Sequence, residues 1–197
     1  DISKSASHTQ SELKDAFAAA ILLAYKEDEE LRYDVRGYTY RFTYWDDRVI
    51  YEVTPRYGQT KEQVDFVSDA VKKLVPQLIT PQMNDHEKVK AIHDYIILNT
   101  EYDLSMDQTY NNPFYALLRQ KTFCGGYSRL AALMLREAGL NARVISGYSS
   151  NGVSSKPVAH AWNLVEVDGE WYHLDITWDD LIFPSTQFQP TYIQYDY

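Results

Sequence analysis

The pair Asp168-Gly169, which separates two runs of alternating apolar and polar residues, is the feature that most limits how this chain can fold. Asp-Gly in this position predicts a β-hairpin with a two-residue turn. In such a hairpin, the residue numbers of each opposed pair have the same sum as those of the two turn residues. Trp162 therefore lies opposite Asp175. His160 and Asp175 become diagonal neighbours on one face of the sheet, with Cα atoms about 7–8 Å apart. A register shift of one residue would place their side chains on opposite faces.

The order of the periodic segments indicates an α+β fold, because helices come first and an antiparallel sheet follows. Hydrophobic periodicity predicts helices over 9–30, 60–79, 84–101, 113–119 and 124–138. It predicts strands over 37–45, 49–53, 142–148, 157–167 and 170–178. Asn84 and Glu87 have the spacing of a capping box at the start of one helix. We therefore expect a helix/β-hairpin/helix region over 1–83 and a second region over 84–197.

Composition and net charge limit the kinds of partner that the chain is expected to bind. The chain has 197 residues, of which 45% are apolar and 24% charged, as is typical of a globular protein of one domain or of one domain with an appendage. No run of apolar residues is long enough to cross a membrane. The net charge of −9 weighs against binding of nucleic acid through a broad basic face. We expect neither a nucleic-acid partner nor a membrane span.

Cys124 is the single cysteine of the chain, which excludes an intrachain disulfide and a zinc site with several thiolates. It lies where a loop becomes a helix, in Thr-Phe-Cys-Gly-Gly-Tyr-Ser. The partial positive charge at a helix N-terminus favours the thiolate form of a cysteine, and the free N–H groups there can bind an oxyanion. Gly125 and Gly126 would let a substrate approach closely. The alternative is a buried cysteine that packs the start of the helix.

Three histidines compete for a role beside this thiol. His160 and Asp175 could form the orienting pair of a Cys-His-Asp triad. His173 lies on the Asp175 face opposite Leu164, but its side chain projects parallel to that of Asp175, which disfavours a direct hydrogen bond. His93 falls on the apolar stripe of a helix and is interpreted as a core histidine. The spacing of the Cys, His and Asp residues matches no zinc pattern, so we predict no metal and no cofactor.

Three segments of the sequence resemble the active-site blocks of the transglutaminase-like superfamily. They are Thr-Phe-Cys124-Gly-Gly-Tyr-Ser, Val-Ala-His160-Ala-Trp-Asn and Trp-Tyr-His-Leu-Asp175-Ile-Thr-Trp-Asp-Asp. The resemblance covers roughly residues 84–180 and is closest to bacterial secreted or envelope-attached members. It implies a papain/transglutaminase-like core in which Cys124 is the nucleophile, His160 the general base and acid, and Asp175 the residue that orients His160.

The oxyanion hole is less well defined by the resemblance. The backbone N–H of Cys124 is the first expected donor. Tyr110, Asn111 and Asn112 lie in the loop before the Cys block and could supply a second one. The tryptophan that serves this purpose in the animal enzymes has no identified equivalent here.

The resemblance implies a thiol enzyme that acts on amide bonds of proteins or peptides through a thioester, by transamidation, deamidation or hydrolysis. A triad is common to these reactions and does not choose among them. The alternatives are a non-catalytic binding or scaffold domain of the cell envelope and another class of Cys-His-Asp enzyme. The first residue is Asp1 rather than Met, so either a signal peptide has been removed or the chain was trimmed. We expect an extracellular or envelope location, and the sequence does not indicate the oligomeric state.

Overall fold

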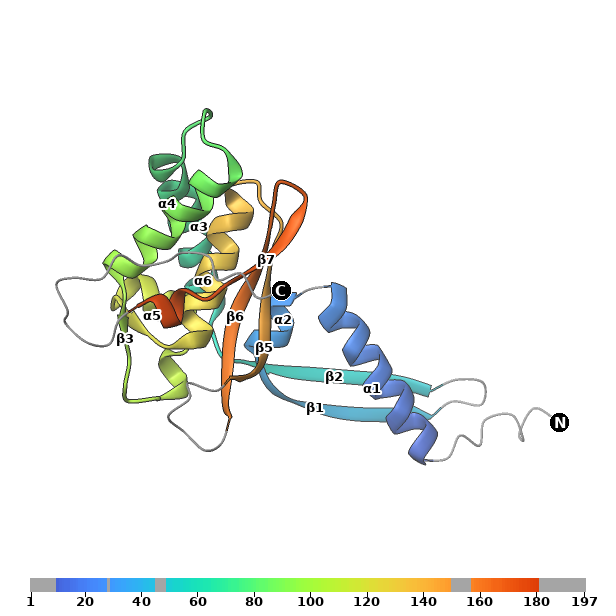
Figure 1. The fold of residues 1–197 in the computed structure, drawn as a ribbon. Coiled ribbons are helices and arrows are strands. Elements are labelled where there is room, and N and C mark those ends of the chain that lie inside the picture. The colour runs from blue at the N-terminus through green and yellow to red at the C-terminus, as the bar shows by residue number, and fades with distance from the viewer. Residues whose placement is uncertain (1–9, 28, 45–48, 150–156, 181–197) are drawn as a thin grey trace. The chain divides into compact units, whose positions relative to one another are not determined.

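The structure, a computed structural model, describes residues 10–27, 29–44, 49–149 and 157–180. The chain divides into two compact units, Asp1–Thr60 (unit 1) and Lys61–Tyr197 (unit 2). Helices and strands occur in both, so the predicted α+β class is confirmed (Figure 1).

Unit 1 consists of two helices and one β-hairpin. The helices are α1 (Gln10–Glu27) and α2 (Glu29–Asp34), and the strands are β1 (Val35–Tyr44) and β2 (Val49–Tyr57). The strands pair antiparallel along their length, with Phe42 opposite Tyr51. The turn expected at Asp46-Asp47 lies outside the described residues.

The second strand of this hairpin is longer than predicted. β2 continues through Pro55, which lies opposite Tyr38, and ends at Tyr57, whereas the sequence indicated an end at Val53. Proline lacks a backbone N–H, but an edge strand tolerates it because one side of such a strand has no pairing partner. β2 is an edge strand, since the sheet has two strands.

Four helices form one layer of unit 2, namely α3 (Lys61–Leu78), α4 (Asp85–Asn99), α5 (Pro113–Leu118) and α6 (Cys124–Glu137). The capping box at the start of α4 is confirmed. The N–H of Glu87 donates to the Asn84 side chain at 2.9 Å, and the N–H of Asn84 donates to the Glu87 carboxylate at 2.8 Å. Valines of α3 are buried with Ile92 and Leu130 in a shared aliphatic core: Val67, Val71 and Val75.

The packing of α3 explains where the chain divides. We placed the boundary of the two regions after residue 83, in the proline-containing segment between two helices. The structure groups the chain into compact units that meet after Thr60, and the boundary after residue 83 stays a prediction. The buried face of α3 completes the core of unit 2, and this helix packs against α4, α5 and α6.

The other layer of unit 2 is a three-stranded antiparallel sheet in the order β5 (Ala142–Ser149), β6 (Val158–Val167) and β7 (Glu170–Leu174). The predicted register of the β6–β7 hairpin is confirmed, because Asn163 lies opposite Leu174. Asp168 and Gly169 have φ angles of 53° and 85°, as a type I′ turn requires. α6 packs against β5 and β6.

The end of this hairpin differs from the prediction. We expected a strand to residue 178, but β7 ends at Leu174 and a single helical turn follows, α7 (Ile176–Asp179). Asp175 is the N-cap of this turn, since its carboxylate accepts a hydrogen bond from the N–H of Trp178 at 3.2 Å. Aspartate is poor in strands and good at helix N-caps, which favours the change of structure at this residue.

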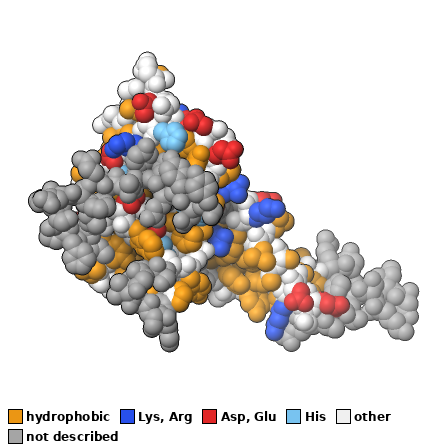
Figure 2. All heavy atoms as spheres, in the orientation of Figure 1, with side chains coloured by type: hydrophobic (Ala, Val, Ile, Leu, Met, Phe, Trp, Pro, Cys, Tyr) orange, Lys and Arg blue, Asp and Glu red, His pale blue; other side chains and the backbone are white. Residues whose placement is uncertain are grey.

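A short parallel pair, β3 (Glu101–Tyr102) with β4 (Lys121–Thr122), connects the start and end of the loop that precedes α6. Within the described ranges, none of the helices combines the length and apolar character needed to cross a membrane. Tyr40 and Val53 of the β1/β2 hairpin are exposed. Figure 2 shows hydrophobic side chains at the surface over this hairpin.

Candidate active site

Cys124 is the first residue of α6 and is partly exposed. The two glycines that follow it make room for the protein's own side chains. A Cβ atom on Gly125 would lie 2.7 Å from Oδ1 of Asn111, and one on Gly126 would lie 1.9 Å from Oγ1 of Thr122. The expectation that these glycines open space for a substrate is therefore wrong, because Asn111 and Thr122 occupy that space.

Of the three loop residues considered as oxyanion donors, Asn111 is the one bonded to the start of α6. Its Oδ1 accepts a hydrogen bond from the N–H of Gly126 at 3.1 Å. Asn112 is buried and caps α5, accepting from the N–H of Tyr115 at 3.3 Å. The ring of Tyr110 packs against Arg119, whose guanidinium lies 4.0 Å from the ring centroid. Asn112 and Tyr110 therefore have structural contacts of their own.

His160 on β6 and Asp175 at the N-cap of α7 are directly hydrogen-bonded. Nε2 of His160 lies 2.7 Å from Oδ2 of Asp175. The other carboxylate oxygen of Asp175 accepts from the N–H of Trp178. Both oxygens are thus engaged, which fixes the orientation of the carboxylate toward the imidazole.

The pKa of His160 is raised to about 9 from its usual 6.5. Burial is the largest single influence and acts to lower the pKa, but hydrogen bonds to Asp175 and Cys124 and the negative charges of both groups outweigh it. Because Nε2 faces Asp175, Nδ1 is the ring nitrogen that remains for the thiol of Cys124. The imidazolium is therefore the main form of His160 at neutral pH, and it lies beside a sulfur at a helix N-terminus.

Two indole rings flank the imidazole of His160. The ring of Trp162 is stacked at 5.8 Å between centroids and that of Trp178 at 5.3 Å. Trp162 also donates from Nε1 to Nδ1 of His173 at 2.8 Å. This bond uses the lone pair of that nitrogen, so His173 has a structural partner, and it lies opposite Leu164 as the register predicted.

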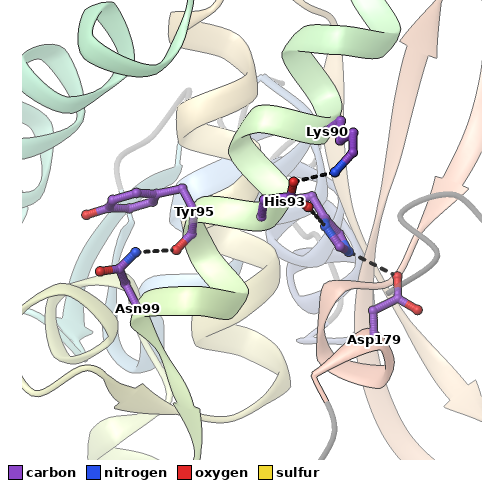
Figure 3. A network of polar contacts seen from close by, with 6 residues as sticks. Lys90, His93, Tyr95, Asn99 and Asp179 are labelled. Atoms are coloured by element: carbon purple, nitrogen blue, oxygen red, sulfur yellow. Dashed lines mark hydrogen bonds and ion pairs between the residues drawn. The ribbon is translucent and has the colours of Figure 1, made fainter. Parts of the chain in front are cut away.

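His93 is a fully buried histidine of α4, as predicted for a core position. Nδ1 lies 3.0 Å from Oδ1 of Asp94, and Nε2 lies 3.3 Å from Oδ2 of Asp179, the last residue of α7 (Figure 3). The sequence indicated the burial of His93 but not its partner 86 residues away.

Tyr102 lies near the thiol and was not identified from the sequence as part of its surroundings, whereas Trp178 was noted among the aromatic residues near the motifs. Burial and then the charge of Cys124 raise the pKa of Tyr102, so its hydroxyl lies within electrostatic reach of the sulfur. The exposed fraction of Trp178 is 44%, which leaves part of its ring open to solvent beside His160. Trp178 lies in the third matching block and Tyr102 in none of the three, and the sequence did not indicate either contact.

A metal site finds no support in the arrangement of ligands. In the part of the chain that the structure describes, no three His, Cys, Asp or Glu side chains are grouped so that they could hold a metal ion. Cys124, His160 and Asp175 are instead connected through the imidazole.

Known proteins similar to this chain include animal and bacterial ones. The chain is 33% identical over 137 residues to the kyphoscoliosis peptidase of Mus musculus, covering 64% of this chain and 21% of that protein. It is 28% identical over 178 residues to the uncharacterized protein YebA of Bacillus subtilis, covering 85% of this chain and 22% of that protein. The chain thus spans about a fifth of the length of these relatives.

A solved structure of a TGase aligns with 70% of this chain and 44% of its own, at a TM-score of 0.49 and 25% identity. The sequence model of the transglutaminase-like superfamily matches residues 72–176, which is just over half of the chain and includes Cys124, His160 and Asp175. The chain therefore belongs to the transglutaminase-like superfamily.

Proposed function

We propose that the chain is a cysteine enzyme that acts on amide bonds of proteins or peptides, with Cys124 as nucleophile, His160 as general acid and base, and Asp175 as the residue that orients His160. One observation carries this proposal. The imidazole of His160 is hydrogen-bonded to Asp175 through Nε2 and interacts with Cys124 on its other side. This is the arrangement that a thiolate–imidazolium pair requires.

The chemistry follows from these positions. The thiolate of Cys124 attacks the carbonyl carbon of the amide, and the carbonyl oxygen becomes an oxyanion. As the C–N bond breaks, the imidazolium of His160 gives its Nδ1 proton to the leaving amine, and a thioester remains. His160 then removes a proton from an incoming amine or water, which attacks the thioester and releases the thiolate. The charge of Asp175 stabilises the imidazolium before each proton donation.

We assign the N–H of Cys124 and the side-chain amide of Asn111 as the hydrogen-bond donors to the oxyanion. Oδ1 of Asn111 faces the N–H of Gly126, so the NH₂ end of the carboxamide is the part that can donate. This NH₂ group has two N–H donors, and the contact recorded for it among the described residues is a long one of 3.4 Å with Gln108. A preorganised donor of this kind contributes about 10²–10³ in turnover.

The names of the relatives favour water as the acceptor of the acyl group. Two of them, at 33% and 36% identity, are named peptidases. Hydrolysis of a peptide or protein amide is therefore the first reaction to test, with transamidation and deamidation as the other outcomes of the same thioester. An extracellular or envelope location is part of this proposal, because the three blocks resemble most closely the secreted or envelope-attached members of the superfamily.

The test is a mass-spectrometric survey of products. The protein is incubated with casein and a labelled amine, and chain cleavage, deamidation and amine incorporation are scored together. We expect one of these products from the wild-type chain and none from Cys124→Ala. Iodoacetamide labelling of Cys124 in the wild type and in His160→Ala distinguishes an enzyme from a scaffold. Equal labelling rates and no product would contradict the proposal.

A further inference from the structure

The turn α7 brings Asp175 and Trp178 to His160, yet it is too short to be stable alone. It has four residues, and an isolated helix of that length is unstable in water. Ile176 and Thr177 are buried, which positions one side of the turn. The polar residues at its end, Asp179 and Asp180, have partners of their own in the layer of helices.

Asp180 contacts the helix that carries the candidate nucleophile. The hydroxyl of Tyr127 donates a hydrogen bond to Oδ2 of Asp180 and lies 3.2 Å from the carbonyl of Thr100. Tyr127 is fully buried and lies three residues after Cys124, about one helical turn along α6. One side chain thus connects the helix of Cys124 to the turn of Asp175.

Asp179 contacts a second helix, α4, through His93. Nδ1 of His93 lies 3.0 Å from the carboxylate of Asp94, and Nε2 lies 3.3 Å from that of Asp179. Lys90 contacts the carboxylate of Asp94 from the exposed side of α4 (Figure 3). The bridge therefore runs from the helix surface through a buried ring to the last residue of α7.

We propose that Tyr127 and His93 are positioning residues, which act through Asp180 and Asp179 to hold α7 where Asp175 and Trp178 contact His160. This inference rests on the proposed function of Cys124, His160 and Asp175. It assigns a role to two buried polar side chains that the reaction itself does not use. Loss of either contact would leave a partly buried carboxylate without this partner and let the turn move.

The first test uses Tyr127→Phe, which removes one hydroxyl from the buried ring. NMR titration of the His160 imidazole in the whole chain, without substrate, reports on the contact with Asp175. We expect the pKa of His160 to fall by about one unit, because the carboxylate that raises it is less well held. We expect kcat to fall about 10–100-fold, with a much smaller change in KM, as is usual when the partner of a functional group is lost.

Tyr95→Phe is the chemical control. It removes a hydroxyl from a tyrosine of α4 whose ring points away from His93 and Asp179 (Figure 3). Val71→Ala on α3 is the stability control, since it removes buried methyl groups from the shared core. Both should keep the wild-type pKa of His160, and Val71→Ala should do so in spite of a lower free energy of unfolding.

A conservative variant of Asp180 should retain turnover that the alanine variant loses. Burial, the largest influence, raises the pKa of this carboxyl, although the hydrogen bond from Tyr127 acts to lower it. Asp180→Asn keeps an oxygen that can accept from Tyr127 and should retain most of the turnover, whereas Asp180→Ala should resemble Tyr127→Phe. The double variant Tyr127→Phe, Asp180→Ala should be no worse than either single change, because both remove one contact.

His93→Gln tests the second contact, and Asp179→Ala tests it from the more exposed end if His93→Gln does not fold. Either should lower kcat and the pKa of His160 as Tyr127→Phe does. A wild-type pKa and kcat in Tyr127→Phe and Asp179→Ala, with a loss of stability like that of Val71→Ala, would overturn the proposal. If Cys124→Ala had wild-type turnover, the proposed function would fail instead, while the titration of His160 would still report on the turn.

Discussion

The two units of the chain use apolar side chains differently. In unit 2 the core is mainly aliphatic, and Ile92 and Leu130 are at most 1% exposed. In unit 1 the ring of Phe17 lies among the tyrosines and phenylalanine of the hairpin, and Tyr40 there is 48% exposed. A closed core fixes side chains to well-defined positions, whereas a half-exposed aromatic cluster leaves its rings room to adjust.

The difference agrees with the place of the candidate site. Cys124, His160 and Asp175 all belong to unit 2, and each is attached to an element that packs against its core. Among the described residues of unit 1, the buried apolar side chains are Leu13 and Phe17. Unit 2 therefore has the packing that precise chemistry requires, and the predictions below test whether activity and stability follow this division.

The largest expected contrast is in activity. Asp175→Asn should lower turnover by about 10²–10⁴-fold, because the amide can stabilise the wrong tautomer of His160 and supplies no charge to the imidazolium. Phe17→Ala in unit 1 should leave turnover unchanged. The assay is turnover of casein, followed through the product that the mass-spectrometric survey detects, with circular dichroism to confirm folding. Inactivation by Phe17→Ala would mean that unit 1 takes part in the reaction.

A smaller contrast is expected in stability. Leu130→Ala should lower the free energy of unfolding by about 2–5 kcal/mol, because it leaves a cavity in a closed core. Phe17→Ala should cost less than about 3 kcal/mol, since half-exposed neighbouring rings can move into the space. Urea unfolding followed by hydrogen exchange in each unit measures both effects. An equal loss in the two variants would show that the cluster of unit 1 is as rigid as the core.

The third contrast depends on pH. The pKa of His160 is raised from 6.5 to about 9 on folding, so protonation of this residue stabilises the folded state. The contribution is fully present below about pH 6.5 and is lost as the pH rises through about 9. The difference in unfolding free energy between wild type and His160→Gln should therefore shrink over this range, while that for Phe17→Ala stays constant. A difference for His160→Gln that grew with pH would contradict the assignment.

The smallest effect is expected on the polar face of the unit 1 hairpin. Arg41 and Glu52 lie opposite each other and approach to 3.8 Å, but both side chains are largely exposed. Water screens such a pair, and ordering two long side chains opposes the attraction. Arg41→Ala should leave the urea midpoint of both units unchanged. A clear shift of the midpoint would show that this ion pair contributes to the stability of the hairpin.

Local patterns account for the parts of the fold that the sequence predicts well. The Asp168-Gly169 turn and the alternation beside it determine the register of the hairpin, because side-chain direction in a strand has a period of two. The capping box at Asn84 is equally local. The end of β7 is different, since Asp175 leaves the strand to cap α7 while its carboxylate contacts His160, 15 residues away. Secondary-structure propensities are local, so they carry no information about that contact.

The candidate site shows the same limit. The resemblance of three short blocks named Cys124, His160 and Asp175, whose roles stay predictions. The fit of Asn111 against Gly125 and the contacts of Asp179 and Asp180 depend on segments that meet only after folding. The sequence also led us to read the two glycines as space for a substrate, because a missing side chain does not reveal what fills the space.

The parallel pair β3–β4 has a consequence for how this family member can vary. The N–H of Glu101 donates to the carbonyl of Gln120, and the N–H of Asp103 donates to that of Thr122, so the intervening segment is a closed loop. The entropy of closing such a loop grows only with the logarithm of its length, and doubling it costs about 0.6 kcal/mol. Insertions at its exposed part, around Leu104, would therefore be tolerated. The chain can therefore vary in length at this exposed point while the pairing of β3 with β4 holds the two ends of the loop together.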